Sequence, residues 1–320
     1  MGLYLVWKAP GPSSGQALSR FKLDLGLGRG REGIGHTGTL DPFAEGLLLV
    51  GTGEATKLLT PLVGLPKTYE AEMLLGLSSD TLDLQGQLAW MPASDRAALA
   101  EACAAERSPW GGAARQEFLG AKRGDFLQRP PAFSALKVDG KRAYELARKG
   151  QEVELKLRPA TILELRELAG PSAQTGSEGV LSGEGFVGWS FEVRVSSGTY
   201  IRCLARDWGQ ELCGHPGLLR SLVRTSIGPF AGARPPAGEG LVRSLGAADL
   251  APLLPILELE PPEVADLLRG GLWRRPKGPE TANRLLVERG HGRCVAFTDE
   301  QGALARVFRS DPFAPDRSVE

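Results

Sequence analysis

An alternation of apolar and charged residues along positions 68–75 constrains the fold of this chain more than any other feature of its sequence. Side chains of an extended backbone point alternately to opposite faces. The apolar residues there, Tyr69 among them, therefore share one face, and the two glutamates share the other. Residues 191–195 repeat the pattern. We expect two strands that each bury one face and expose the other.

Helix signals accompany these strands. Ser13 and Gln16 have the spacing of a capping box, so a helix is expected to begin after Ser13. Thr199 follows the second alternating strand and is expected to cap a helix that Gly214 ends. We also expect strands at 3–6 and 47–50. Helices are expected at 54–59, ended by Pro61, at 91–119, broken near Ser108, and at 141–149, ended by Gly150. Residues 168–190 are expected to form a loop or a long hairpin connection.

Proline-rich composition divides the chain near residue 250. Arg234 begins the run RPPAG, and prolines recur over 252–262. Few contacts usually cross such segments, and 320 residues suffice for two domains. The C-terminal piece is expected to begin with a helix and to continue as strands, at 262–269, 284–287, 294–297 and 304–308.

The chain is neutral overall, with 38 Lys and Arg against 38 Asp and Glu, so bulk charge does not attract a polyanion. Two local clusters, 122–149 and 269–293, each carry a net charge of +5. They indicate a surface for a polyanion, although a solvated charged face is the commoner explanation. A glycine-rich loop with Arg29 and Arg31 is either a basic loop near a phosphate backbone or a plain turn.

Several classes of protein are not expected. No apolar run approaches the roughly 18 residues of a membrane span, and no basic region precedes an apolar stretch at the N-terminus, so a cytoplasmic protein is expected. The four cysteines lack the spacing of a zinc site, and we expect reduced thiols and no structural metal. The G-x-G-x-x-G match at 28–33 is not expected to bind a nucleotide, because a helix precedes it and none follows.

The stretch 35–46 holds a carboxylate on a loop. Pro42 restricts Asp41 to an extended backbone, and the surrounding glycines let a tight loop approach a ligand closely. The buried strand expected at 47–50 follows directly. An aspartate before proline is also a common turn residue, so this pattern alone leaves a turn and a catalytic loop both open.

Five blocks, in order along the chain, resemble the TruB-type tRNA pseudouridine synthases. GHTGTLDPFAEGLLLVGTGEATKLL at 35–59 resembles the catalytic signature of that family. The other blocks, which extend the resemblance over essentially 3–230, are KTYE at 67–70 with DTLD at 80–83, QRPPAFSALKVDGKRAY at 128–144, GTYIR at 198–202, and LVRT at 222–225 with GP at 228–229.

This resemblance implies an α+β protein. The catalytic domain, expected over 1–250 with an insertion at about 90–190, has a curved, mostly antiparallel mixed sheet. Residues 251–320 resemble the small β-rich, PUA-like RNA-binding domain that ends many members. The family uses no cofactor and no metal. It isomerises the uridine at position 55 of the tRNA T-loop to pseudouridine.

The resemblance also assigns roles to residues. Asp41 is expected to be the catalytic carboxylate, which attacks the uridine at C1′ or at ring C6. Arg202 is expected to keep it ionised, because a neighbouring guanidinium favours the charged form. Tyr69 is expected to stack on the extruded base with its hydroxyl near C5. His36 is expected to stabilise the space that the flipped bases leave, and Leu222 to line the uracil pocket.

Further contacts are expected around this centre. Thr37, Gly38 and Tyr200 are expected to bind the substrate. The residues expected at the RNA backbone are Arg29, Arg31, Lys67, Arg129, Lys137, Arg142, Arg274 and Arg275. The implied partner is the T-arm and elbow of tRNA, bound by a stand-alone monomer that needs no protein partner and no membrane. The family usually has the motif Lys-Pro-x-Gly near its N-terminus, whereas Lys8-Ala9-Pro10-Gly11 places the proline one position later.

Two other functions stay open. A non-catalytic protein on the same fold would bind and refold the tRNA elbow, although the joint presence of Asp41, Tyr69 and Arg202 argues against lost catalysis. A hydrolase that acts on the glycosidic bond would pair Asp41 with Asp80 or Asp83 and release free uracil.

Overall fold

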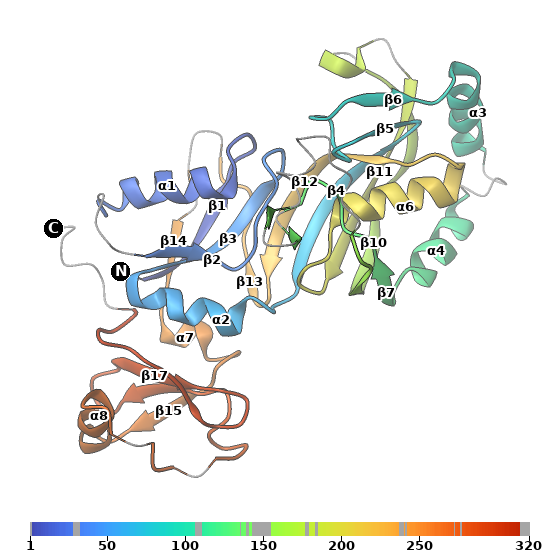
Figure 1. The fold of residues 1–320 in the computed structure, drawn as a ribbon. Coiled ribbons are helices and arrows are strands. Elements are labelled where there is room, and N and C mark those ends of the chain that lie inside the picture. The colour runs from blue at the N-terminus through green and yellow to red at the C-terminus, as the bar shows by residue number, and fades with distance from the viewer. Residues whose placement is uncertain are drawn as a thin grey trace. The chain divides into compact units, whose positions relative to one another are not determined.

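The computed structural model of the 320-residue chain describes most of its length (Figure 1). The described residues are 2–27, 33–105, 111–134, 136–138, 141–142, 155–176, 179–182, 185–236, 240, 242–271, 273–275 and 277–313. They divide into two compact units. The first unit comprises Met1–Gly64 and Pro229–Glu320, and the second comprises Leu65–Gly228.

An antiparallel sheet organises the N-terminal part of the first unit. Its strand β1 pairs with β14 on one side and β3 on the other, and β2 pairs with β3. These strands are β1 Leu3–Lys8, β2 Ile34–His36, β3 Glu45–Thr52 and β14 Val242–Leu245. The other elements are α1 Ser14–Asp24, the 3₁₀ helix η1 Gly53–Leu58, α2 Leu59–Leu62, β13 Phe230–Ala231 and α7 Ala247–Leu250. The predicted strands at 3–6 and 47–50 are confirmed as parts of β1 and β3.

Helix α1 begins where the capping pattern predicts. The Gln16 N–H donates to the Ser13 hydroxyl at 3.2 Å, and the Ser13 N–H donates to the Gln16 side chain at 2.8 Å. The Phe21 ring meets the Tyr4 ring of β1 edge-on, with centroids 5.2 Å apart. This contact holds α1 against the strand that leads into it.

The second unit contains five strands in the order β12, β4, β11, β10, β7, each antiparallel to its neighbours. They are β4 Lys67–Leu75, β7 Gly124–Gln128, β10 Arg158–Thr175, β11 Gly185–Val195 and β12 Leu218–Ile227. Tyr69 lies opposite Val193 of β11 and opposite Arg224 of β12. The strands predicted at 68–75 and 191–195 are therefore confirmed, and they are neighbours.

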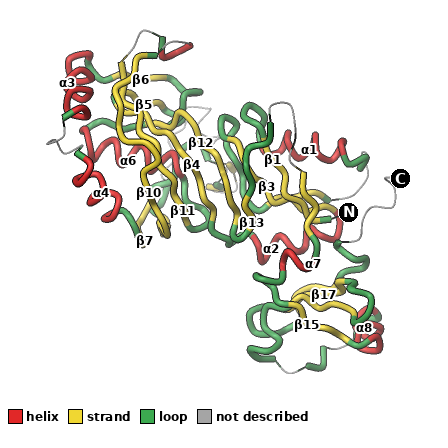
Figure 2. The backbone as a smooth tube through the Cα atoms, turned by 180° about the vertical axis from the view of Figure 1, so that it is seen from behind, coloured by secondary structure: helices red, strands yellow, loops and turns green. Residues whose placement is uncertain are grey.

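Helices cover the face of this sheet that carries Tyr69. Trp208 packs against Phe191 of β11 with ring centroids 5.0 Å apart, and Phe191 shares a face with Val193 and hence with Tyr69. Figure 2 shows α4 and α6 beside the strands of this sheet. The helices are α3 Ala93–Ala104, α4 Gly112–Ala121 and α6 Ile201–Cys213. Smaller elements are β5 Leu77–Ser79 with β6 Leu88–Trp90, β8 Lys137–Val138 with β9 Lys141–Arg142, and the 3₁₀ helix η2 Gly179–Leu181.

The C-terminal part of the first unit has a sheet of its own, in the order β15, β16, β17, β18. These strands are β15 Ile256–Leu259, β16 Leu285–Glu288, β17 Cys294–Thr298 and β18 Leu304–Val307, and they are accompanied by α8 Pro261–Leu268. Leu259, Val264, Leu286 and Val295 form its buried core. The predicted helix and three strands are confirmed, and β15 is an addition. Among the strand pairs with described register, only β15 with β16 is parallel, so the α+β class is confirmed.

Two predicted helix boundaries are wrong. The helix expected at 54–59 does not end before Pro61, because η1 continues into α2, where a proline in the first turn removes no helical hydrogen bond. Thr199 does not cap α6. Tyr200 occupies the N-cap position, and the Thr199 hydroxyl donates to the Ser196 carbonyl at 2.9 Å.

Two further segments differ from the sequence prediction. Most of 168–190 is strand, because β10 continues to Thr175 and β11 begins at Gly185, so the glycine-rich region forms a long hairpin. Lys141–Arg142 is strand β9 rather than the start of a helix. Residues 143–149 of that predicted helix, and the predicted break near Ser108, lie outside the described residues.

Candidate active site

The loop between β2 and β3 carries Asp41. The Ser14 hydroxyl donates to the Leu40 carbonyl at 2.9 Å and accepts the Leu40 N–H at 2.8 Å. On the other side of Asp41, the Gly11 N–H donates to the Pro42 carbonyl at 2.8 Å. The backbone before and after Asp41 is therefore fixed, while Asp41 itself is half-buried.

A buried ammonium supports the same loop. Lys8 ends β1 and is 1% exposed, and its Nζ donates to the carbonyls of Ala9, Pro42 and Ala44 at 2.9, 3.2 and 2.6 Å. Such acceptors offset the cost of removing a cation from water. Sequence reasoning missed this role. The available signal was a lysine that ends an otherwise apolar strand.

His36 ends β2, and Thr37 and Gly38 begin the loop. The Gly38 N–H donates to His36 Nδ1 at 3.1 Å, and this bond orients the imidazole ring against the loop backbone. Thr37 is 2% exposed, and within the described part of the chain no group hydrogen-bonds its hydroxyl. A buried hydroxyl of this kind is uncommon and marks a position where a bound group can complete the hydrogen bond.

In the second unit, Tyr69 and Leu222 occupy one covered face. Tyr69 is 8% exposed and Leu222 is 5% exposed. Leu222 lies opposite Ala71, which is two residues beyond Tyr69 and so points to the same side. Arg224 shares this face and was not singled out by the sequence. The sequence feature that could have indicated Arg224 is a charged residue two positions after Leu222, whose side chain faces inward.

Lys67 is also buried, two positions before Tyr69 in β4. It is 4% exposed, and its Nζ donates to the Ser197 hydroxyl at 3.1 Å. Burial, together with the positive charge of Arg224, lowers the pKa of Lys67 to about 8. A buried ammonium does not favour the predicted contact with an RNA backbone.

Arg202 connects three segments of the second unit. It is 4% exposed, and its two terminal nitrogens donate to the carbonyls of Thr81 at 2.7 Å and Phe133 at 3.0 Å. Leu82, next to Thr81, has a left-handed backbone with a φ of 61°. The Thr81 hydroxyl donates to the Asp83 carboxylate at 2.6 Å. The guanidinium thus joins α6 to this strained turn and to the 128–134 segment.

Gln128 fixes the start of α6. Its side-chain amide donates to the Tyr200 carbonyl at 3.0 Å and accepts the Tyr200 N–H at 2.9 Å. Because Gln128 is 3% exposed, both bonds are shielded from water. This pairing sets the backbone position of Tyr200, two residues before Arg202.

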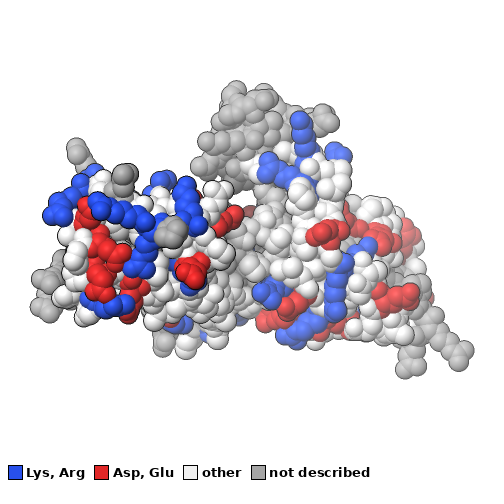
Figure 3. All heavy atoms as spheres, turned by 90° about the horizontal axis from the view of Figure 1, so that it is seen from below, with Lys and Arg blue, Asp and Glu red and all other residues white. Residues whose placement is uncertain are grey.

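The residues predicted at the RNA backbone differ in exposure. Those outside the described residues or side chains are Arg29, Arg31, Lys137 and Arg142. Arg129 and Arg274 are exposed. Arg275 instead forms a two-point ion pair with Glu263, with nitrogen to oxygen distances of 3.0 and 2.9 Å. On the face shown in Figure 3, positive side chains are interspersed with negative ones.

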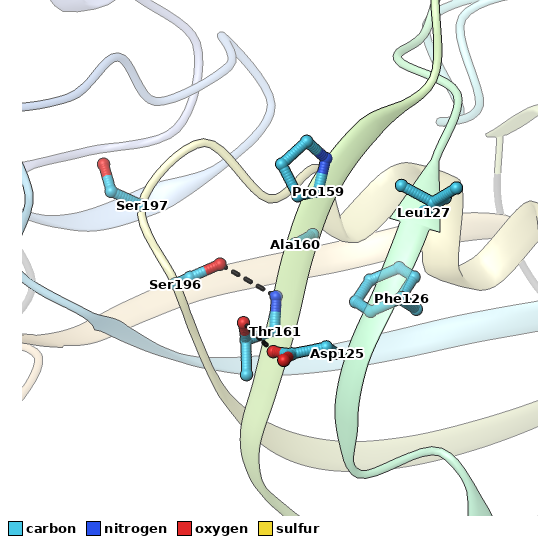
Figure 4. Close-up of a pocket in the computed structure, with 8 residues that line it drawn as sticks. All are labelled: Asp125, Phe126, Leu127, Pro159, Ala160, Thr161, Ser196 and Ser197. Carbon is cyan, nitrogen blue, oxygen red and sulfur yellow. Dashed lines mark hydrogen bonds between the residues drawn. The ribbon is translucent and has the colours of Figure 1, made fainter.

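A cavity of about 530 Å³ lies beside β7 and β10 in the second unit (Figure 4). Its polar groups bond to one another: the Thr161 N–H donates to the Ser196 hydroxyl at 2.9 Å, and the Thr161 hydroxyl donates to the Asp125 carboxylate at 2.7 Å. Neither Tyr69 nor Arg202 lines it. The cavity therefore excludes these two residues, although Ser197, which accepts the Lys67 hydrogen bond, lines it.

None of the four cysteines, all of which lie in the described ranges, forms a disulfide, and burial raises the pKa of Cys103 to about 11, which disfavours the reactive thiolate. Among the described residues, no three His, Cys, Asp or Glu side chains gather as metal ligands. None of the helices in the described ranges is long and apolar enough to cross a membrane.

The candidate residues divide between the two units. His36, Thr37, Gly38 and Asp41 lie together in the first unit. The second unit holds Tyr69, Tyr200, Arg202 and Leu222, with Lys67, Gln128 and Arg224 as additions. Each unit thus supplies a group capable of chemistry, an ionisable residue on a fixed loop in the first and a tyrosine on a covered face in the second.

Comparison with known proteins gives the family. Residues 29–201 match the model of the TruB family pseudouridylate synthase N-terminal domain. The chain belongs to this family. It is 38% identical over 318 residues to tRNA pseudouridine synthase B of Corynebacterium aurimucosum, covering 97% of this chain and 96% of that protein. It is 39% identical over 320 residues to tRNA pseudouridine synthase B of an Azoarcus species, covering 96% and 94%.

Solved structures support the fold. A structure described as a Cbf5-Nop10-Gar1 complex is similar with a TM-score of 0.58 at 20% identity, and the alignment covers 98% of this chain and 87% of that chain. At this level of identity the similarity concerns the fold alone.

Proposed function

We propose that this chain is a tRNA pseudouridine synthase that isomerises the T-loop uridine at position 55. The observation that carries the proposal is near-complete alignment with relatives named tRNA pseudouridine synthase B, at 38% and 39% identity. The fixed loop around Asp41 supports it, because a nucleophile must be held in place before the base arrives.

The proposed chemistry is balanced without an oxidant, reductant, metal or cofactor. The Asp41 carboxylate attacks the uridine at C1′ or at ring C6, and Arg202 keeps that carboxylate ionised. The C1′–N1 bond breaks, uracil turns, and a C1′–C5 bond forms, while the bond between Asp41 and the substrate breaks and restores the free carboxylate. C5 then loses a proton and N1 gains one. Tyr69 stacks on the base and its hydroxyl oxygen takes the C5 proton.

The remaining assignments concern recognition. His36 occupies the space that the flipped base leaves, Leu222 lines the uracil pocket, and Thr37, Gly38 and Tyr200 contact the substrate. The exposed Arg129 and Arg274 support the assignment of RNA-backbone contacts. We further propose a catalytic domain over 1–250, an RNA-docking domain over 251–320, and a monomer that acts in the cytoplasm without a protein partner.

The test is incubation of the purified chain with an unmodified tRNA transcript in buffer containing EDTA, followed by carbodiimide mapping of pseudouridine. We expect a reverse-transcription stop that marks pseudouridine at position 55. It should vanish in Asp41→Asn, while tRNA affinity stays within about threefold. Asp24→Asn, at an exposed position on α1, is the matched control. Free uracil would contradict an isomerase, and tight binding without modification would favour a tRNA-folding protein.

A further inference from the structure

Arg224 lies directly opposite Tyr69 in the sheet. Its Nη1 donates to the Tyr69 hydroxyl oxygen at 3.4 Å, and its guanidinium carbon lies 5.9 Å from the centre of the Tyr69 ring. Arg224 is 1% exposed. The guanidinium therefore touches the two parts of Tyr69 that the proposed reaction uses, the ring and the hydroxyl.

A second cation lies on the same face. Lys67 is 4% exposed, and its lowered pKa reflects both burial and the charge of Arg224. Like charges kept close together away from water repel each other. Arg224 is therefore held beside Tyr69 in spite of this repulsion.

We propose that Arg224 is a positioning residue that holds the Tyr69 hydroxyl in place for removal of the C5 proton. The inference rests on the proposed function. Because the guanidinium is always a donor and never an acceptor, the oxygen must turn a lone pair toward it, and the hydroxyl proton must point elsewhere. The contact with the ring restrains rotation of the side chain.

The step that depends on this orientation is a proton transfer. The C5–H bond breaks, its electron pair restores the ring double bond, and the proton goes to the Tyr69 oxygen once that oxygen has released its own proton, to N1 or to solvent. Arg224 keeps all its protons throughout. A loosely held hydroxyl would slow this step, since misplacement by about 1 Å can cost about 10²-fold in rate.

The first experiment is a double-mutant cycle on the full chain with unmodified tRNA. Single-turnover rates and tRNA affinities are measured for Arg224→Gln, Tyr69→Phe and the double variant. We expect Arg224→Gln to be slower by about 10²-fold with tRNA affinity nearly unchanged, and the double variant to be no slower than Tyr69→Phe. Independent, additive losses would overturn the inference.

A second measurement separates positioning from general damage to the fold. With tRNA deuterated at uridine C5, Arg224→Gln should have a larger isotope effect than the wild type, because C5–H cleavage has become the slow step. An unchanged isotope effect would overturn the inference. Arg224→Lys keeps the positive charge and donates only, so it should recover part of the rate if Arg224→Gln folds poorly. Arg220→Gln, on the same strand but 41% exposed in its side chain, is the matched control.

Failure of the proposed function has a different signature. If the wild type forms no pseudouridine, the enzymatic assignment is wrong. If the wild type is active and Tyr69→Phe is equally fast, Tyr69 does not take the C5 proton and the role of Arg224 fails with it. An active wild type, a slow Tyr69→Phe and additive losses would leave the function standing and remove the role of Arg224 alone.

Discussion

Ser14 and Leu40 exchange two hydrogen bonds, from the Ser14 hydroxyl to the Leu40 carbonyl and from the Leu40 N–H back to that hydroxyl, at 2.9 and 2.8 Å. Ser14 is 2% exposed and Leu40 immediately precedes Asp41. One buried side chain therefore satisfies both backbone groups of the residue next to the proposed nucleophile, and it couples α1 to the loop.

Ser14→Ala should loosen this loop. It leaves a buried N–H and a buried carbonyl without their partner, at a cost of about 1–3 kcal/mol in unfolding free energy. We expect lower stability in urea unfolding and slower pseudouridine formation. Ser19→Ala, on the exposed side of the same helix, should change neither. Equal effects of the two substitutions would contradict a special role for Ser14.

Lys8→Met should damage the same loop from the opposite side. Three carbonyl acceptors lose an ionic donor, so we expect a loss of a few kcal/mol in stability and a large loss of rate. Thermal unfolding and single-turnover rates measure both. Lys156→Met, at an exposed position, is the control. A variant with normal stability and rate would show that these bonds do not hold the loop.

Lys67→Met should stabilise the fold at pH 7. The pKa of Lys67 is about 8 in the folded state against an ordinary value of 10.5, so below pH 8 the folded state bears the full cost of the buried charge, on the order of 3 kcal/mol. Between pH 8 and 10.5 the unfolded state holds more protons, and wild-type stability should gain from this group as pH rises. Urea unfolding at pH 7 and pH 10 should reveal that gain in the wild type only. An equal pH response in Lys67→Met would refute the shifted pKa.

Arg129 and Arg275 should differ in their effects on tRNA. Arg129→Gln removes an exposed cation, so tRNA binding should weaken and its logarithmic salt slope should fall by about 1. Arg275→Gln breaks the ion pair with Glu263 and should lower stability while leaving the salt slope unchanged. Filter binding at several salt concentrations, with parallel thermal unfolding, tests both. The reverse pattern would mean that Arg275 faces the RNA.

The sequence by itself determined the local elements and the family. Alternation at 68–75 fixed which face of β4 is buried, and the spacing of Ser13 and Gln16 fixed the start of α1, because both patterns act over a few residues. The ordered blocks led to the family that the comparisons report, with Asp41 on its loop.

Only the tertiary structure decided which distant residues meet. Gly- and Ser-rich residues near 170 and 188 became strand, since pairing between β10 and β11 satisfies their backbone whatever their side chains prefer. Lys8 and Arg224 appear in sequence as single charges without a partner nearby in the chain. Their acceptors and neighbours, Ala44 and Tyr69, lie 36 and 155 residues away, and such contacts depend on packing and strand register rather than on local pattern.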